Sequence, residues 1–267
     1  DGFTVGNQGQ VNKSNGDYYV GWNWKANGSG SANTDGSINS TVSLNSTSGF
    51  SIVSYTGTQS AGTVGHGLGV IPSAIIVKSL ASQDAWYVWF KGFSGTEALF
   101  LDTTSAKGSH ASYWNSTTPT SSVYSVLNNT GTNNSAGMIA YCFAEKKGYS
   151  KVGSYKGNAS TDGTFIYTGF KPAWVMIKNA DAAEQWRIYD SKREPSNQMF
   201  KCIFPNANNG ENTTDNASEE IDFVSNGIKI RSSSQQLNGN NQQLMYMAFA
   251  EEPLVANVGA SIPATAR

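Results

Sequence analysis

Carboxylate side chains near the ends of strand-like segments are the first residues in this sequence that could do chemistry. Hydrolysis of a glycosidic bond needs two such acids, one on either side of the bond and in different environments. No spacing sets one pair apart, and an acid beside a turn is usually solvated. We therefore expect a protein that is not an enzyme, although eight acids stand as candidates: Asp84, Glu97, Asp102, Glu184, Asp190, Glu219, Glu220 and Asp222.

The two histidines follow no recognisable catalytic or metal-binding pattern. His66 lies in the glycine-rich stretch GTVGHGLG (62–69), which lacks the Lys-Ser/Thr ending of a phosphate-binding loop. A turn between strands is the favoured interpretation, and a loop that contacts a ligand is the alternative. His110 lies in a serine-rich loop without an acidic or cysteine neighbour, so we expect its side chain to be solvated.

The two cysteines, Cys142 and Cys202, fall within apolar strand-like runs. Cysteine is readily buried, so two buried free thiols are the favoured interpretation. A disulfide would need Cα atoms within about 7 Å of each other, and the sequence leaves that pairing open. With two histidines and no CxxC motif, the sequence predicts no metal and no cofactor.

Aromatic side chains are the more informative group, with 7 Trp, 12 Tyr and 12 Phe. Residues three apart in a strand lie on opposite faces, so Trp86 and Trp89 cannot both face one core. Exposed Trp and Tyr beside Asn and Ser bind sugars by ring stacking and amide hydrogen bonds. Trp89 and Trp114 are therefore the candidate glycan-contacting residues, and the alternative is that these rings fill the core and its rim.

Charge is scarce in this chain: 14% of its 267 residues are charged, against roughly 25% in an average globular protein. The 18 basic and 19 acidic residues nearly cancel, which favours neither nucleic-acid binding nor attraction to an anionic membrane. No apolar run approaches the ~20 residues of a membrane span, so membrane insertion is not expected. Hydroxyl and amide groups must supply most of the polar surface.

Alternation with a period of two residues dominates the chain and predicts an all-β fold. The strand-like runs are rich in β-branched and aromatic residues and end at Gly, Asn, Ser or Pro. No window sustains a helical stripe of apolar residues. Strands are expected at 18–25, 49–57, 72–79, 85–91, 97–103, 137–145, 148–157, 163–170, 172–179, 185–191, 199–204, 221–226, 227–232 and 242–252.

The sequence also repeats itself at a constant offset of 100 residues. Roughly six to eight strands in each repeat, separated by polar turns, predict tandem antiparallel β-sandwich repeats that are jelly-roll-like. His66 has Ile166 at the same offset, which argues for a structural position rather than a catalytic one. The matched pairs include Pro72/Pro172, Lys78/Lys178, Trp86/Trp186, Tyr55/Tyr155, Gly57/Gly157 and Gly69/Gly169.

This repeat divides the chain into five segments. The first matches the closing part of a repeat, so we expect Phe3–Val5 to pair with Tyr19–Trp24, and the natural start to lie upstream. The segments are a C-terminal hairpin of a preceding repeat (1–25), a polar linker (26–48), β-sandwich repeat 1 (49–145), β-sandwich repeat 2 (146–253) and a C-terminal tail (254–267).

Several stretches together resemble a repeat domain of virion proteins from marine bacteriophages, which infect cyanobacteria and other ocean bacteria. They include YVGWNWKANG, GFSIVSYTGTQSAGTVGHGLGVIPSAIIVK, SAGMIAYCFAEKKGYSKVGSYKGN and TGFKPAWVMIK followed by WRIYDSKR. The resemblance covers essentially the whole chain. It carries no defined chemistry, and no catalytic or binding residue can be transferred from it.

The resemblance implies a structural protein of the virion exterior, a tail fibre or another appendage, that acts in host-surface adhesion or particle assembly. Expected partners are other virion proteins, a host surface glycan or receptor, and further copies of the chain, with three copies by analogy with tail fibres. Two other classes stay open. One is a carbohydrate-active depolymerase on the particle, and the other is a secreted bacterial lectin or adhesin.

Overall fold

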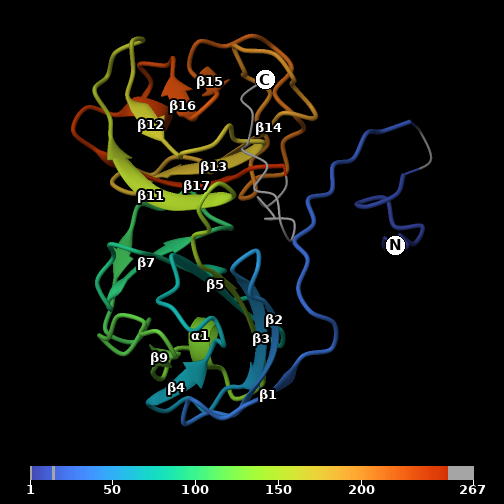
Figure 1. Cartoon of the computed structure of the whole chain (residues 1–267), viewed down its shortest axis with the longest axis vertical. Helices are drawn as coiled ribbons and strands as arrows, with labels where there is room; N and C mark the ends of the chain where they lie inside the picture. The colour runs from blue at the N-terminus through green and yellow to red at the C-terminus, as the bar shows by residue number, and fades with distance from the viewer. Residues whose placement is uncertain (1, 14–15, 252–267) are drawn as a thin grey trace, which may run out of the picture.

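The computed structural model describes residues 2–13 and 16–251, and the tail expected at 254–267 lies outside them. Strands make up nearly all of the regular structure (Figure 1), so the all-β prediction is confirmed. Two helices of four residues each interrupt it, α1 (Thr130–Asn133) and α2 (Gln235–Asn238). No helix among the described residues is long and apolar enough to span a membrane.

Residues 30–145, here called unit 1, form a large sheet covered on one face by a small one. The small sheet pairs β4 (Gly62–Gly65) with β9 (Val123–Val126). The large sheet has eight strands in the order β1 (Ser31–Asn33), β2 (Ser40–Asn45), β3 (Phe50–Thr56), β10 (Gly137–Phe143), β5 (Ala74–Ser79), β6 (Tyr87–Phe90), β7 (Glu97–Phe100) and β8 (Gly108–Ser109).

Residues 146–251, here called unit 2, repeat this plan with fewer strands. The small sheet orders β12 (Phe165–Tyr167), β16 (Gly227–Ile230) and β15 (Ile221–Val224). The large sheet orders β11 (Ser150–Lys156), β17 (Gln243–Phe249), β13 (Trp174–Asn179) and β14 (Arg187–Asp190). This order corresponds to β3, β10, β5 and β6 of unit 1.

The repeat extends to individual hydrogen bonds. The Tyr55 hydroxyl donates to the carbonyl of Thr132 over 2.5 Å, and Tyr155 donates to that of Leu237 over 2.6 Å. The residue after each acceptor is a buried asparagine, Asn133 in unit 1 and Asn238 in unit 2. Its side-chain amide bonds the turn that follows the tyrosine's strand, at residues 58–60 in unit 1 and 158–160 in unit 2. The two units are therefore the same structure built twice.

The two units stack face to face, so the molecule has four sheet layers (Figure 1). One apolar cluster joins the large sheets and includes Ile76 and Phe143 of unit 1 with Trp174 and Met247 of unit 2. The indole Nε1 of Trp186 also donates to the carbonyl of Phe100 over 2.8 Å. Both faces of each large sheet are therefore covered, which explains the uninterrupted apolar runs in β5 and β13.

The hairpin predicted for residues 1–25 does not form. No strand occurs among described residues before Ser31, because the two tryptophans enter the boundary between the units instead. The ring of Trp24 lies edge-on to Trp174 with centroids 5.2 Å apart, and Trp22 donates to an Asp190 oxygen over 3.1 Å. The described residues before this anchor form an arm that leaves the body of the molecule (Figure 1).

The polar linker predicted at 26–48 is also wrong. Strands β1 and β2 lie within it, and β2 pairs with β3 from Ser40 opposite Tyr55 to Asn45 opposite Phe50. Alternate residues of this segment, among them Ile38 and Val42, face the core. Asn, Ser and Thr at the remaining positions hide that alternation in the sequence.

Candidate functional site

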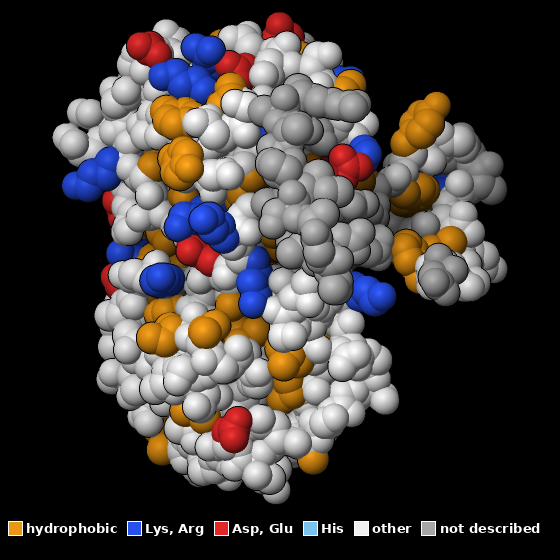
Figure 2. All heavy atoms as spheres, in the orientation of Figure 1, with side chains coloured by type: hydrophobic (Ala, Val, Ile, Leu, Met, Phe, Trp, Pro, Cys, Tyr) orange, Lys and Arg blue, Asp and Glu red, His pale blue; other side chains and the backbone are white. Residues whose placement is uncertain are grey.

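Strand β12 stands out because it presents two aromatic rings to solvent. Phe165 is 45% exposed and Tyr167 is 65% exposed, whereas Ile166 between them is buried. This is the period of two expected for a strand with one face on the core. Figure 2 shows exposed hydrophobic side chains in the region where Figure 1 places β12.

The backbone of β12 is exposed as well, because this strand ends its sheet. Its ladder with β16 is antiparallel, and the amide of Ile230 donates to Thr164 and that of Thr168 to Asn226. Hydrogen-bonded and non-bonded positions alternate in such a ladder. The N–H and C=O groups of Phe165 and Tyr167 therefore face away from β16, toward the free edge of the sheet.

Unit 1 covers the equivalent edge with its own chain. Beside β4, the amide of Ile38 donates to the carbonyl of Thr63 over 2.9 Å, and Ile38 and Val64 form a parallel bridge. The hydroxyl of Ser40 donates to the carbonyl of Gly65 over 3.1 Å. In unit 2 no strand or bridge of the described residues pairs with that edge.

The residue types follow this difference. Phe165 and Tyr167 occupy positions where unit 1, at the offset of 100 residues, has Gly65 and Gly67. A Cβ on Gly65 would lie 1.8 Å from the Asn33 side-chain oxygen, so the covering segment leaves no room for a side chain. The open face of unit 2 carries large rings instead.

The charged side chain directly opposite β12 in the ladder is paired. Lys229 lies opposite Phe165 in the ladder, and its ammonium group bonds the Gly163 carbonyl at 2.5 Å and Asp162 at 2.6 Å. That interaction holds the pKa of the Asp162 carboxyl below its usual value. The strand can bind a partner by ring contacts and by main-chain hydrogen bonds.

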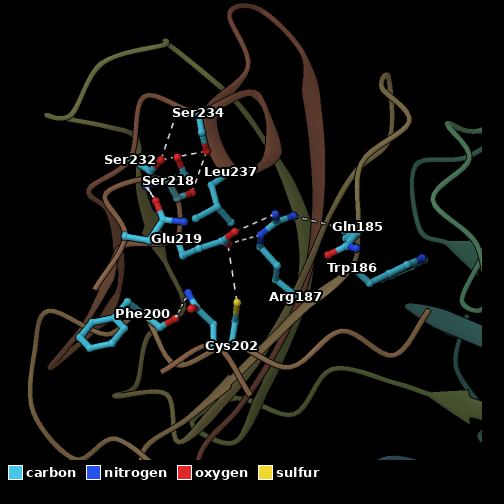
Figure 3. A network of polar contacts seen from close by, with 12 residues as sticks. Gln185, Trp186, Arg187, Phe200, Cys202, Ser218, Glu219, Ser232, Ser234 and Leu237 are labelled. Atoms are coloured by element: carbon cyan, nitrogen blue, oxygen red, sulfur yellow. Dashed lines mark hydrogen bonds and ion pairs between the residues drawn. The ribbon is translucent and has the colours of Figure 1, made fainter. Parts of the chain in front are cut away.

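A second cluster, shown in Figure 3, lies inside unit 2. Arg187 and Glu219 form a buried ion pair, in which the second guanidinium bond measures 3.0 Å. The Tyr189 hydroxyl donates to the Glu219 carbonyl over 2.8 Å, and the Cys202 thiol lies 3.6 Å from the Glu219 carboxylate. Burial raises the pKa of Cys202 to about 12, so the group is a thiol rather than a nucleophilic thiolate. These contacts hold the core together.

Both predicted glycan-contacting residues are buried, so neither can contact a glycan. Trp89 is 3% exposed and donates to the Ser94 carbonyl, while Trp114 is 0% exposed and donates to that of Glu97. Trp89 faces the core of unit 1, where its large sheet is covered by the small one. Trp86 and Trp89 lie on opposite faces of their strand, but this does not expose either ring, because the stacked units cover both faces of the sheet.

The histidines hold structure. His66 is buried: its Nδ1 accepts from the Leu68 amide, so the proton resides on Nε2 and is donated to the Thr120 carbonyl. Burial lowers the pKa of this imidazole, which keeps it neutral. His110 is exposed, as expected, and its Nδ1 lies 2.7 Å from the Ser112 hydroxyl.

Six of the eight candidate acids have a hydrogen-bond or ion-pair partner. Ion pairs join Glu97 to Lys107, Asp190 to Arg193 and Asp222 to Arg231, in addition to the buried pair of Glu219. Asp84 accepts from the Ser82 hydroxyl, and Asp102 accepts from the Trp86 amide. Over residues 2–13 and 16–251, no group of three or more His, Cys, Asp or Glu could hold a metal ion.

Both cysteines are buried and free, as the favoured interpretation expected. Cys142 lies in the apolar cluster that fills unit 1 and reaches the boundary between the units, and Cys202 lies in the separate apolar cluster of unit 2. Burial raises the pKa of Cys142 to about 12 as well. Neither thiol can serve as a nucleophile where it lies.

A groove of about 370 Å³ runs along the boundary between the units, next to the tryptophan anchor. Apolar side chains of both large sheets line it, including Ile52, Tyr141, Met176 and Met247. Since it offers few polar groups to fix the orientation of a ligand, it supports the packing of the units better than it supports recognition.

The chain belongs to a family described as a domain of unknown function, DUF7483, whose model matches residues 1–253. Among curated proteins and solved structures, none matches this chain.

Proposed function

We propose that this protein is a structural component of a bacteriophage particle, located on its exterior, and that it acts by binding, in particle assembly or in host-surface adhesion. The observation that carries the proposal is the open strand β12, with Phe165 and Tyr167 exposed at a position that unit 1 covers with its own chain. A face that carries large rings in one unit and glycines in the other serves contact with something outside the unit.

Three further observations support this proposal. The stretches quoted above resemble repeat domains of marine phage virion proteins. The low charge content suits a particle in seawater, where salt screens surface ion pairs within a few ångströms. Two stacked sandwiches with a shared apolar boundary make a rigid block, and copies of such a block multiply weak contacts. Assembly into several copies, with three by analogy with tail fibres, is part of the proposal.

The location can be tested on the particle itself. Antibodies raised against the purified chain should label the exterior of phage particles whose genome encodes it, as seen by immunogold electron microscopy. Particles that lack the label, with the protein found only in infected cells, would contradict the proposal.

The mode of action needs a separate measurement. The purified chain, labelled with a fluorophore, should adsorb to host cells if it is an adhesin, and a variant with both Phe165→Ala and Tyr167→Ala should adsorb at least tenfold less. Leu80→Ala is the matched control, because Leu80 is 66% exposed and lies outside β12. Release of reducing sugar from host polysaccharide by the unlabelled chain would favour the depolymerase class instead.

A further inference from the structure

We propose that the free edge of β12 in one copy of this chain accepts residues 18–20 of the arm of a second copy as an added strand. The inference rests on the proposed function, because it names the partner that the open strand takes during assembly. Two features that lack a counterpart among residues 2–13 and 16–251 carry it: a strand edge without a neighbouring strand, and a strand-forming segment without a sheet.

The arm supplies the segment. Its sequence from Tyr18 to Val20 is aromatic and β-branched, which favours a strand, yet no strand forms there. Tyr18 is 101% exposed and Val20 is 38% exposed, so two apolar side chains of this stretch lie in solvent. The Tyr19 hydroxyl donates to the Gly9 carbonyl over 2.8 Å, which turns Tyr19 toward the arm's own loop. One apolar side of the segment is left to meet a partner.

The edge supplies the matching half. Strand β12 has three residues, and its two outward residues, Phe165 and Tyr167, expose both their rings and their outer backbone groups. Exposed edges of this kind template the pairing of another chain. An added strand with Tyr18 and Val20 on the ring-bearing face would bury these four side chains against one another.

Unit 1 provides the precedent for what sits on this edge. There the occupant is an extended stretch of polypeptide around Ile38, bound in parallel to β4 by main-chain hydrogen bonds. The same position in unit 2 should therefore accept polypeptide. For the arm we expect the antiparallel direction, because there Tyr18 and Val20 form hydrogen-bonded pairs with Tyr167 and Phe165 and all four side chains lie on one face. A glycan would use the rings alone and would leave the edge amides without this pairing.

The occupant comes from another copy because of where the arm lies. The arm leaves the molecule beside β14, on the opposite side from β12 (Figure 1), and the anchor at Trp22 and Trp24 fixes its root there. Figure 2 shows hydrophobic side chains exposed on the projecting arm. A contact between the arm of one copy and β12 of the next is head-to-tail, so it closes into a ring or extends into a filament.

The test is self-association of the full chain, measured by sedimentation velocity over a range of concentrations. The wild type should form oligomers, and Tyr167→Pro should weaken association at least tenfold. Proline removes the outward amide that an added strand needs, while the ladder to β16 keeps its bonds. Tyr167→Thr keeps the amide and should weaken association less than Tyr167→Pro does.

Val20→Pro tests the other half from a part of the chain that lies outside both sandwiches. It should weaken association at least tenfold and leave the melting temperature unchanged, so a misfolded β12 variant would not leave the question undecided. Amide hydrogen exchange should slow at Tyr167 and Val20 as the concentration rises. A chain that stays monomeric, oligomers unaffected by Val20→Pro, or equal effects of Tyr167→Pro and Tyr167→Thr would each overturn the proposal.

Discussion

Units 1 and 2 share a strand order and a set of hydrogen bonds, but differ in what surrounds the shared frame. Unit 1 extends its large sheet with β1 and β2, and the chain between these strands covers the edge of β4. Unit 2 has no such extension, and β12 stays open. A repeat of this kind keeps its strand order, while the segment that precedes the shared strands decides which surface is available for contact.

The two interiors also differ in chemistry. The core of unit 1 around Trp89, Trp114 and Tyr124 is aromatic, whereas unit 2 places Arg187 and Glu219 in the corresponding space between its sheets. At the offset of 100 residues, Arg187 replaces Tyr87. The same frame therefore tolerates either rings or a charge pair, provided that each polar group has a partner.

The largest expected effect comes from breaking the charge pair of unit 2. Arg187→Ala leaves Glu219 buried without its partner, and removing one member of a buried pair costs about 3 to 5 kcal/mol. Chemical denaturation followed by fluorescence measures the loss. Lys151→Ala is the control, because its pair with Glu145 is part exposed and should contribute less than about 1 kcal/mol. If Arg187→Ala lost no more unfolding free energy than Lys151→Ala, the core of unit 2 would not depend on the Arg187–Glu219 pair.

The shared frame can be tested by matched substitutions in both units. The Asn133 amide donates to the carbonyls of Ser60 and Leu127, and that of Asn238 donates to Ser160 and Ser232. Alanine at either position leaves buried backbone groups without partners, at a cost of about 2 to 3 kcal/mol in unfolding free energy.

The two losses should agree within about 1 kcal/mol if the turns are equivalent. Differential scanning calorimetry of Asn133→Ala and Asn238→Ala gives the comparison. A large loss in one unit and none in the other would break the equivalence.

The sequence predicted most of the strands and the repeat because both depend on local spacing, although the favoured interpretation of residues 62–69 as a turn missed β4. Period two marks most strands, and the offset of 100 residues aligns Tyr55 with Tyr155. It did not align Asn133 with Asn238, which are 105 residues apart, because the loops before them differ in length. Polar residues hid β1 and β2 for a related reason: a strand that contributes few apolar side chains looks like a loop.

The candidate site could not be located from the sequence because exposure depends on distant segments. Trp89 is buried by the covering sheet, and β12 is exposed because unit 2, as described, begins at its β3 counterpart and has no segment equivalent to residues 36–40. One signal was present in the repeat itself: Phe165 and Tyr167 stand where the first copy has glycine. An aromatic residue at a position where the other unit has glycine indicates that the surface there is covered in one unit and open in the other.

Because a segment covers β4 and none covers β12, the aligned residues Gly65 and Phe165 should differ in how well they tolerate substitution. Gly65→Ala places a methyl group against the Asn33 side chain and the segment it belongs to, and overpacking of this kind costs about 1 to 2 kcal/mol. Phe165→Ala changes a side chain on an open strand, so it should cost at most about 0.5 kcal/mol. Thermal melts of both variants check this. A Gly65→Ala protein as stable as the wild type would mean that the covering segment is loosely held.

The smallest expected effect concerns His66, which unit 2 replaces with Ile166. Burial holds the folded-state pKa of His66 below its ordinary value of 6.5, so the unfolded chain takes up the proton first as the pH falls. The stability tied to neutral His66 is therefore complete above pH 6.5 and declines as the pH drops from there toward the folded-state pKa. Urea unfolding at pH 8 and pH 5 should show a larger decline in the wild type than in His66→Ile, which carries the residue of unit 2 and cannot titrate. Equal declines would mean that acids elsewhere account for the whole dependence, and that the two units respond to pH alike.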